Sequence, residues 1–443
     1  MARITLSYSP GIKALVYGRE ARDEPPPLPI LPISTLRKMR SSFTAFASLA
    51  ALLSAVAPVL SVAVYGQDKA TQAQQSATPA PYAPTPTHCL PGTATASPTK
   101  TTSSASSSGT GTPTSTGTVP GNSVCAGSRT KFKFFGVSES GAEFGGTAWP
   151  GVLGKDYTWP SPSSIDYFVG QGFNTFRVPF LVERMNPPAN GLAGAFDQTY
   201  LSGLKTIVNY ITGKGAFAVI DPHNYMRYNN AIITSVSDMG LFASFTTFWT
   251  NLAGEFKSNA NVIFDIMNEP YGIDASTVFT LNQAAVNAIR AAGATQQLIL
   301  VEGTAWTGAW SWQSSGNADV FGAIKDPNNN VAIQMHQYLD SDSSGTSATC
   351  VSSTIGAERL QEATQWLQAN GLKGLLGEIG AGSNAQCISA VQGALCAMQE
   401  SGVWIGALWW AAGPWWGDYF QSIEPPNGAA IAQILPQALK PFL

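Results

Sequence analysis

Eight short apolar runs mark the second part of the chain, and stretches with helical spacing separate them. The runs are residues 132–138, 175–180, 216–222, 262–268, 298–303, 331–338, 374–380 and 404–410. Each has the length expected of a buried strand. Between them, segments such as 280–293 and 356–371 repeat Ala, Leu and Gln at helical spacing and end at a glycine.

Eight strands that alternate with helices are typical of a parallel (β/α)8 barrel, the TIM barrel. The alternative is a doubly wound sheet, which usually carries a glycine-rich phosphate loop after its first strand. The stretch GVSESGAEFGG at 136–146 does not have the required G-x-G-x-x-G spacing. We therefore predict an α/β fold in which a (β/α)8 barrel occupies residues 122–443.

The residues before this region lack the alternation. Residues 1–38 are charged and then proline-rich, so we interpret them as disordered or as an extension upstream of the natural start. From Met39 onward, a basic residue is followed by an apolar run and a tail of small residues. This is the layout of a secretory signal peptide, which we predict over residues 39–66. A signal-anchor helix is the alternative, although Pro58 favours cleavage. We expect a secreted, extracellular protein with no stable membrane association after processing.

Composition narrows the classes of function. Charged residues make up 12% of the chain, the net charge is −3 and the barrel region has no basic run, so we expect no nucleic-acid partner. With three histidines and five cysteines that lack metal-ligand spacing, the usual zinc sites are not expected. Twelve tryptophans need either a large core or a surface on which flat groups stack.

Polar or aromatic side chains stand at the carboxyl end of nearly every predicted strand. In strand order they are Ser138, Arg177, His223, Asn268 with Glu269, Glu302 or Thr304, His336 with Tyr338, Glu378, and Trp410. Loop composition alone would explain a single Asn-Glu-Pro, because these residues are common where strands end. It does not explain ionisable residues at so many ends, which in a parallel barrel share the rim where active sites lie.

Glu269 and Glu378 end the fourth and seventh predicted strands, whose tips face each other across a barrel mouth. Two opposed carboxyl groups suit glycoside hydrolysis, in which one donates a proton and the other meets a developing oxocarbenium ion. Their pKa values must differ, so their surroundings must separate them. We expect Arg177 to keep one of the two carboxyl groups ionised and the amide of Asn268 to donate to a sugar hydroxyl. His336 and Tyr338 are expected to hydrogen-bond around the nucleophile.

Six stretches resemble signature stretches of glycoside hydrolase family 5, in its fungal endoglucanase branch: GFNTFRVPF, DPHN, FDIMNEP, HQYLD, LLGEIG and LWWAAGPWWGDY. They occur in order over residues 130–443. The resemblance implies Glu269 as general acid/base and Glu378 as nucleophile. The supporting shell that it implies consists of Arg177, His223, Asn268, His336, Tyr338 and Trp410.

The resemblance also implies a retaining mechanism through a covalent glycosyl-enzyme. The two carboxyl groups would then lie about 5–5.5 Å apart, and no metal or cofactor would be needed. The region NEPYGID, which begins at Asn268, varies within this branch, so it leaves the details of the subsites open.

An indole can cover the apolar face of a pyranose ring. Trp410, at the end of the eighth strand, is our candidate for the floor of the cleavage subsite. Three tryptophans after the fifth strand are candidate platforms further along a cleft, with core packing as the alternative: Trp306, Trp310 and Trp312. Three others are expected to pack inside the protein: Trp249, Trp366 and Trp409.

Cys350 and Cys387 flank the sixth and seventh units. In a secreted protein they would form a disulfide, and the family resemblance agrees. Cys125 with Cys396 is a second candidate pair, and buried free thiols are the alternative.

Ser, Thr, Gly and Pro dominate residues 93–121, which predicts an extended, disordered linker. Residues 67–92 are too few and too polar to fold alone. VYGQ at 64–67 and CLPGTATAS at 89–97 resemble the two ends of a fungal family 1 cellulose-binding module, but the intervening cysteines and most aromatic residues are missing. We interpret the segment as a remnant of such a module, in which Cys89 has no obvious partner.

The sequence therefore predicts a secreted, monomeric, retaining endo-β-1,4-glucanase that acts on cellulose or another β-glucan. One alternative is a β-mannanase or β-1,3-glucanase on the same barrel, which would use the same catalytic residues. The other is a non-catalytic glycan-binding protein on a decayed barrel. That reading predicts the loss of Glu269 or Glu378, and both are present.

Overall fold

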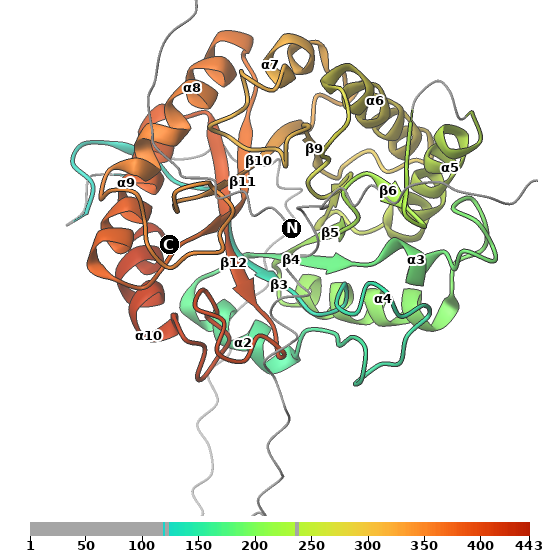
Figure 1. Cartoon of the computed structure of the whole chain (residues 1–443), viewed down its shortest axis with the longest axis horizontal. Coiled ribbons are helices and arrows are strands. Elements are labelled where there is room, and N and C mark those ends of the chain that lie inside the picture. Colours follow the sequence, from blue (N-terminus) through green and yellow to red (C-terminus); the bar gives the residue numbers. More distant parts are fainter. Residues whose placement is uncertain (1–117, 120–123, 235–238) are drawn as a thin grey trace, which may run out of the picture. The chain divides into compact units, whose positions relative to one another are not determined.

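Eight parallel strands close into a barrel in the computed structural model, and helices surround it (Figure 1). The structure describes residues 118–119, 124–234 and 239–443. The barrel confirms the predicted (β/α)8 fold. The interpretations of residues 1–38, 39–66 and 67–92, and of the linker apart from 118–119, lie outside the described residues.

The barrel strands follow one another round the barrel in chain order, and the last pairs with the first. All eight predicted runs coincide with them. They are β3 (Phe134–Glu139), β4 (Thr175–Phe180), β5 (Phe217–Pro222), β8 (Val262–Asp265), β9 (Ile299–Glu302), β10 (Val331–Tyr338), β11 (Gly374–Gly380) and β12 (Trp404–Ala412). Two small antiparallel sheets add β1 (Thr118–Val119) with β2 (Arg129–Thr130), and β6 (Arg227–Tyr228) with β7 (Ala231–Ile232).

Helices connect consecutive barrel strands, and several begin at a side chain that accepts an unpaired backbone N–H. Ser161, Asp197 and Asn384 cap α2, α4 and α9 in this way. Among the described residues, no helix is long and apolar enough to cross a membrane. The helices are α2 (Pro162–Gln171), α3 (Val182–Met185), α4 (Gln198–Gly213), α5 (Met239–Phe256), α6 (Ala275–Ala291), α7 (Asn317–Val320), η1 (Phe321–Ala323), α8 (Ile355–Asn370), α9 (Ala385–Ser401), α10 (Ile431–Ile434), η2 (Leu435–Leu439) and η3 (Lys440–Phe442).

Seven of the eight barrel strands contribute to two separate apolar clusters, because successive side chains point to opposite faces; β4 contributes only to the larger one. The larger cluster packs the outer faces of the strands against the helices and includes Phe176, Phe264 and Trp409. The smaller one fills the barrel interior and includes Phe134, Val219, Ile263, Leu300, Ala332, Leu375 and Leu408.

Polar side chains replace the apolar ones two residues further along several strands. Val219 is followed at this spacing by Asp221, and Ile263 by Asp265. Leu300 is followed by Glu302, and Ala332 by Gln334 and then His336. The period of two thus places an ionisable layer inside the barrel, above the apolar layer and toward the carboxyl ends of the strands.

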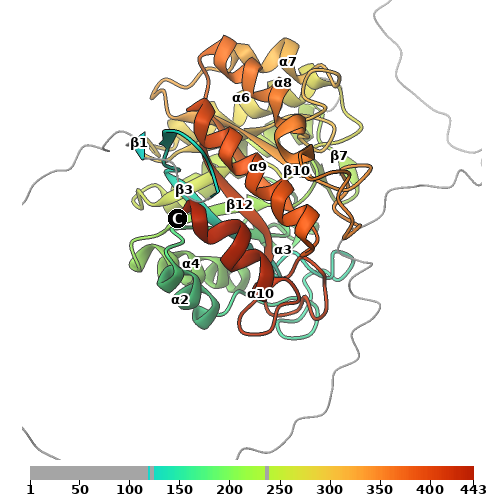
Figure 2. The ribbon, with the colours of Figure 1, turned by 90° about the vertical axis from the view of Figure 1, so that its left-hand side faces the viewer.

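Two disulfides join the described residues, and α9 takes part in both. Cys350–Cys387 ties the loop after β10 to the start of α9, as predicted, with a Cα–Cα distance of 5.4 Å. Cys125–Cys396, the second candidate pair, ties the segment before β2 to α9, at 5.6 Å. The segment that contains β2 lies against α9 (Figure 2). Cys89 lies outside the described residues.

Candidate active site

Glu269 and Glu378 lie close together at the carboxyl end of the barrel. Glu269 follows β8 and Glu378 lies within β11, and both side chains are buried. One carboxylate oxygen of each glutamate and one ring nitrogen of His336 form a group in which every atom lies within 4.8 Å of the others. Glu269 has a left-handed backbone, with φ of 46°, and its N–H donates to Oε2 of Glu302 at 2.7 Å. This strained conformation and its buried acceptor hold Glu269 in place.

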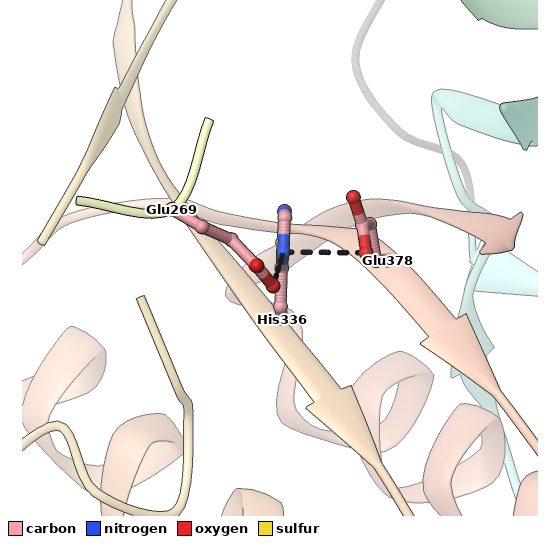
Figure 3. Close-up of side chains that lie close together, drawn as sticks. All are labelled: Glu269, His336 and Glu378. Atoms are coloured by element: carbon pink, nitrogen blue, oxygen red, sulfur yellow. Dashed lines mark hydrogen bonds and ion pairs between the residues drawn. The ribbon is translucent and has the colours of Figure 1, made fainter. Parts of the chain in front are cut away.

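His336 stands between the two glutamates (Figure 3). Its Nδ1 lies 2.9 Å from Oε1 of Glu269 and 3.5 Å from Oε2 of Glu378. Because a carboxylate only accepts, the ring nitrogen is the donor. The β10–β11 register shifts between Met335 and His336, and this shift sets His336 directly opposite Glu378.

Glu378 receives a donor on each of its oxygens. Nη1 of Arg177 lies 2.9 Å from Oε1, and the hydroxyl of Tyr338 donates to Oε2. Burial and the charge of Glu378 raise the pKa of Tyr338 well above its usual range, so Tyr338 remains a donor. Gly345 packs under the Tyr338 ring: its φ is 72°, and a Cβ there would lie 2.5 Å from the ring. Only glycine fits both demands.

Arg177 lies among the buried carboxylates of this layer and is fully buried itself. Burial lowers its pKa, but four neighbouring carboxylates outweigh burial, so the pKa is raised well above its usual range. Its guanidinium nitrogens contact five side chains: Glu378 at 2.9 Å, Asp265 at 2.9 Å, Asn268 at 2.7 Å, Asp221 at 3.0 Å and Glu302 at 3.5 Å.

Glu302 and Asp265 support this arrangement from below. Burial raises the pKa of both groups. The charge of Asp221 raises both pKa values further, and the charge of Asp265 also raises that of Glu302. Gln334 donates to both, at 2.7 Å to Asp265. Because one arginine cannot balance four carboxylates, the raised pKa of Glu302 allows it to carry a proton and lower the local negative charge.

His223 and Asn268 form a second chain of contacts that ends at Trp410. Nδ1 of His223 lies 2.8 Å from Asp221, and Nε2 lies 3.2 Å from Nδ2 of Asn268. Burial lowers the pKa of His223, but Asp221 outweighs burial, so the pKa is raised. The imidazole stacks on the Trp410 ring at 5.5 Å and 15°. His223 therefore orients both the amide of Asn268 and the indole of Trp410.

A cleft of about 450 Å³ opens beside Glu269 and His336. Trp306 and Trp310 line it and are 47% and 51% exposed, which agrees with their predicted role as platforms. Tyr225 and Tyr271, which the sequence analysis did not single out, line it too, as do Gln337, Tyr338 and the loop that follows β10.

The prediction of a third platform at Trp312 is wrong. Trp312 is fully buried and packs against Phe321 and Trp366. The turn that exposes Trp310 directs the side chain of Trp312, two residues later, inward. The three tryptophans that were expected to pack inside the protein are indeed buried: Trp249, Trp366 and Trp409.

Arg177, His336 and Glu378 lie within their strands rather than beyond them. Of the two residues proposed for the end of the fifth strand, Glu302 belongs to the site, whereas Thr304 donates to the carbonyl of Ile273.

Sequence reasoning missed three buried partners of Arg177 and Glu302: Asp221, Asp265 and Gln334. Their signal was present, because each stands two residues after an inward-facing apolar residue of its strand. Charged or amide side chains at core positions of a strand point to a buried polar network.

Within the described ranges, one group of side chains has potential metal-ligand atoms close enough together to hold a metal ion: Glu269, His336 and Glu378. The oxygens of Glu378 already accept from Arg177 and Tyr338, and a guanidinium at 2.9 Å repels a second cation. The arrangement is therefore better suited to proton and glycosyl transfer than to metal binding.

Comparison with known proteins agrees with this geometry. The family model "Cellulase (glycosyl hydrolase family 5)" matches residues 128–414. Endo-beta-1,4-glucanase B of Emericella nidulans is 51% identical over 308 residues, which cover 69% of this chain and 90% of that protein. Endoglucanase 3 of Humicola insolens is 53% identical over 302 residues, covering 68% and 75%.

Solved structures show the same fold. XacCel5A in complex with cellopentaose superposes with a TM-score of 0.67 at 42% identity, covering 70% of this chain and 99% of that one. Cel5A (EG2) of Hypocrea jecorina gives a TM-score of 0.62 at 30% identity, covering 70% and 99%. The matched range of the family model spans the barrel strands and includes both glutamates, so this chain belongs to the cellulase family, glycosyl hydrolase family 5.

Proposed function

We propose that this protein hydrolyses internal β-1,4-glucosidic bonds of cellulose and related β-glucans with retention of configuration. Glu378 is the nucleophile and Glu269 the general acid/base. The observation that carries the mechanism is the close approach of the two carboxylates, of which one oxygen each lies within 4.8 Å of the other. A retaining enzyme needs carboxyl groups roughly 5–5.5 Å apart, whereas an inverting one needs roughly 6.5–9.5 Å to fit a water between them.

Glu378 is suited to attack because its partners fix it and balance its charge. Arg177 is permanently charged and holds one carboxylate oxygen, while Tyr338 holds the other. In the first step an oxygen of Glu378 bonds to the anomeric carbon as the bond to the leaving oxygen breaks. The product of this step is a covalent glycosyl-enzyme.

Glu269 is suited to proton transfer because its partner is a histidine. His336 Nδ1 at 2.9 Å can hold the carboxylate without a permanent charge. Glu269 donates its proton to the leaving oxygen in the first step. In the second step it takes a proton from the water that attacks the anomeric carbon and releases Glu378.

The aromatic side chains support a glycan as the substrate. Trp410 stacks on His223 beside the glutamates, and Trp306 and Trp310 line the cleft on the Glu269 side. Asn268 binds Arg177 through its Oδ1 at 2.7 Å, and its amide carries two N–H groups, so one can reach a sugar hydroxyl while the other faces His223. The names of the relatives support β-1,4-glucans over mannans or β-1,3-glucans.

Secretion belongs to the same proposal. The layout of residues 39–66 supports an exported chain. The two disulfides support an oxidising, extracellular location. We expect the secreted enzyme to be a monomer.

The test is reducing-sugar release by the purified protein on carboxymethylcellulose, with mannan and laminarin in parallel. We expect activity on the cellulose derivative that disappears in Glu378→Gln. Activity on mannan or laminarin alone would keep the mechanism and overturn the substrate. Silence on all three would favour a glycan-binding protein.

A second measurement tests the roles of the residues. A 2-deoxy-2-fluoro-β-cellobioside with a good leaving group should add one glycosyl group to the protein, and peptide mapping should find it on Glu378. A label on another residue, or release of the α-anomer as first product, would overturn the retaining assignment.

A further inference from the structure

Three flat groups from three different loops stack on one another at the cleft. The guanidinium carbon of Arg227, on β6, lies 3.8 Å from the centre of the Tyr271 ring. Tyr271, after β8, also stacks on Trp306, after β9, at 5.0 Å between ring centres and 8° between planes. Because a guanidinium at 3.8 Å occupies one face of the Tyr271 ring, the indole has room only on the other face, which gives the order guanidinium, phenol and indole. The cleft borders the indole.

Hydrogen bonds, and not ion pairs, hold the guanidinium in this stack. Nη1 of Arg227 donates to the carbonyl of Tyr225 at 2.7 Å, and Nη2 donates to that of Tyr271 at 3.0 Å. Arg290, by comparison, pairs with Asp326 at 2.8 Å, whereas Arg227 has no carboxylate partner in the part of the chain that the structure describes. Its planar shape and directed N–H groups thus matter more here than its charge.

Trp306 needs such support because its own environment is open. It is 47% exposed, and the turn that carries it is left-handed at three successive residues, with φ of 56°, 55° and 49° at Ala305, Trp306 and Thr307. The backbone N–H of Trp306 donates to the carbonyl of Pro270 at 3.0 Å, and Pro270 directly precedes Tyr271 in the chain. Backbone and ring are therefore both tied to the loop after β8.

The position of this cleft identifies the part of the substrate that it receives. Glu269, the proposed proton donor to the leaving oxygen, lines the cleft together with Trp306. Trp410 is not part of its lining. A sugar on Trp306 therefore belongs to the leaving group, on the far side of the scissile bond.

We propose that Arg227 is a positioning residue which, through Tyr271, holds the Trp306 indole as a preformed platform for a pyranose ring of the leaving group. This inference rests on the proposed function. Because the stack orders the indole before substrate arrives, binding does not have to order it. Arg227 thus contributes to binding of polymeric substrates without touching them.

The experiment compares Arg227→Gln and Arg227→Lys with the unchanged protein on two substrates. Cellopentaose places sugars on the leaving-group side, whereas β-cellobiosyl fluoride releases only a fluoride ion. We expect KM for cellopentaose to rise roughly two- to tenfold, with a smaller change for the fluoride. Arg227→Lys should not restore KM, because an ammonium cannot stack and donate to both carbonyls.

A double-mutant cycle separates positioning from general damage. In a Trp306→Ala background, Arg227→Gln should add no further rise in KM, because the group through which it acts is gone. Lys214→Gln is the matched control: this ammonium lies 4.8 Å from the Tyr210 ring on α4, and neither residue lines the cleft. KM should not respond to that change, and thermal unfolding of every variant shows that it is folded.

Several outcomes would overturn the inference. Equal effects on both substrates, full rescue by lysine, or additive effects of Arg227→Gln and Trp306→Ala would each do so. Loss of activity in Glu378→Gln alongside such a result would leave the proposed function standing. Full activity of Glu378→Gln would instead remove the proposed function and, with it, the basis of the platform.

Discussion

Below the two glutamates, the barrel interior holds one arginine among buried carboxylates, whereas the rim beside Glu269 holds two half-exposed tryptophans. In the interior, hydrogen bonds and ion pairs fix each group, and those of Arg177 measure 2.7–3.5 Å. At the rim, stacked rings and an arginine without a carboxylate partner in the described ranges fix the platform.

The difference follows from what each region has to do. Charges act most strongly where water is excluded, so the groups that stabilise the transition state lie inside the barrel. A polymer must enter and leave, so the rim uses open apolar surfaces that bind sugar faces without burying charge. Changes in the interior should therefore lower kcat, and changes at the rim should raise KM.

The largest expected effect distinguishes the catalytic role of Glu269 from that of Glu378. In Glu269→Ala we expect kcat on cellopentaose to fall by roughly 10²–10⁴-fold, because no acid protonates the leaving oxygen. Formation of the glycosyl-enzyme from β-cellobiosyl fluoride should suffer much less, since fluoride leaves without a proton. Added azide, which needs no general base, should restore turnover of the fluoride, as measured by fluoride release. An equal loss on both substrates would contradict the assigned role.

The next prediction concerns the buried arginine. Arg177→Lys keeps the charge but cannot reach Glu378, Asp265 and Asn268 together. We expect kcat to fall roughly 10²-fold, because the nucleophile loses its fixed position, with little change in KM. Arg184→Lys is the control, since this buried arginine donates to the carbonyls of Ala142 and Gly145. If kcat fell equally in both variants, the contacts of Arg177 with Glu378, Asp265 and Asn268 would have no specific role in catalysis.

Two neighbouring tryptophans test the boundary between core and rim. Trp312→Ala should lower the free energy of unfolding by roughly 3–5 kcal/mol, because it leaves a cavity beside Phe321 and Trp366. Trp310→Ala should leave stability nearly unchanged and raise KM for cellopentaose roughly two- to tenfold. Denaturant unfolding and steady-state kinetics measure both. A stable Trp312→Ala with a raised KM would restore Trp312 as a platform.

The smallest effect concerns two carboxyl groups away from the catalytic pair. Glu139 and Glu424 both lie 2.9 Å from the hydroxyl of Ser164, which has one hydrogen to donate. Burial, followed by the charge of Glu424, raises the pKa of Glu139 well above its usual range, and burial raises the pKa of Glu424. The folded protein therefore binds more protons here than the unfolded chain does.

Stability from this pair is present in full below the unfolded pKa, about 4.3, and is lost as pH rises through the raised folded pKa. Glu139→Gln cannot ionise, so its free energy of unfolding should fall less between pH 4.5 and pH 8, by about 1 kcal/mol. Glu255→Gln, at an exposed ion pair with Lys205, is the control. A pH dependence identical to that of the unchanged protein would show that folding does not raise the pKa of Glu139.

Much of the fold and site could be predicted from the sequence because the relevant signals are local. Apolar runs of 6–8 residues repeat eight times, and this repetition predicts the barrel. The residues at the ends of those runs indicate Glu269, Glu378, His336 and Arg177, because the carboxyl ends of parallel strands share one rim. Period-two alternation assigns Trp409 to packing against the helices and Trp410 to the opposite face of the strand, where it lies in a different cluster.

The tertiary structure decided what depends on residues that are distant in sequence. Arg177 and Glu378 are 201 residues apart, and no local pattern states that they touch. The burial of Trp312, the exposure of Trp310 and the pairing of Cys125 with Cys396 depend on how separate loops and helices meet. The stack of Arg227, Tyr271 and Trp306 joins three loops. Local sequence sets which elements form, but only closure of the barrel brings these side chains within contact distance.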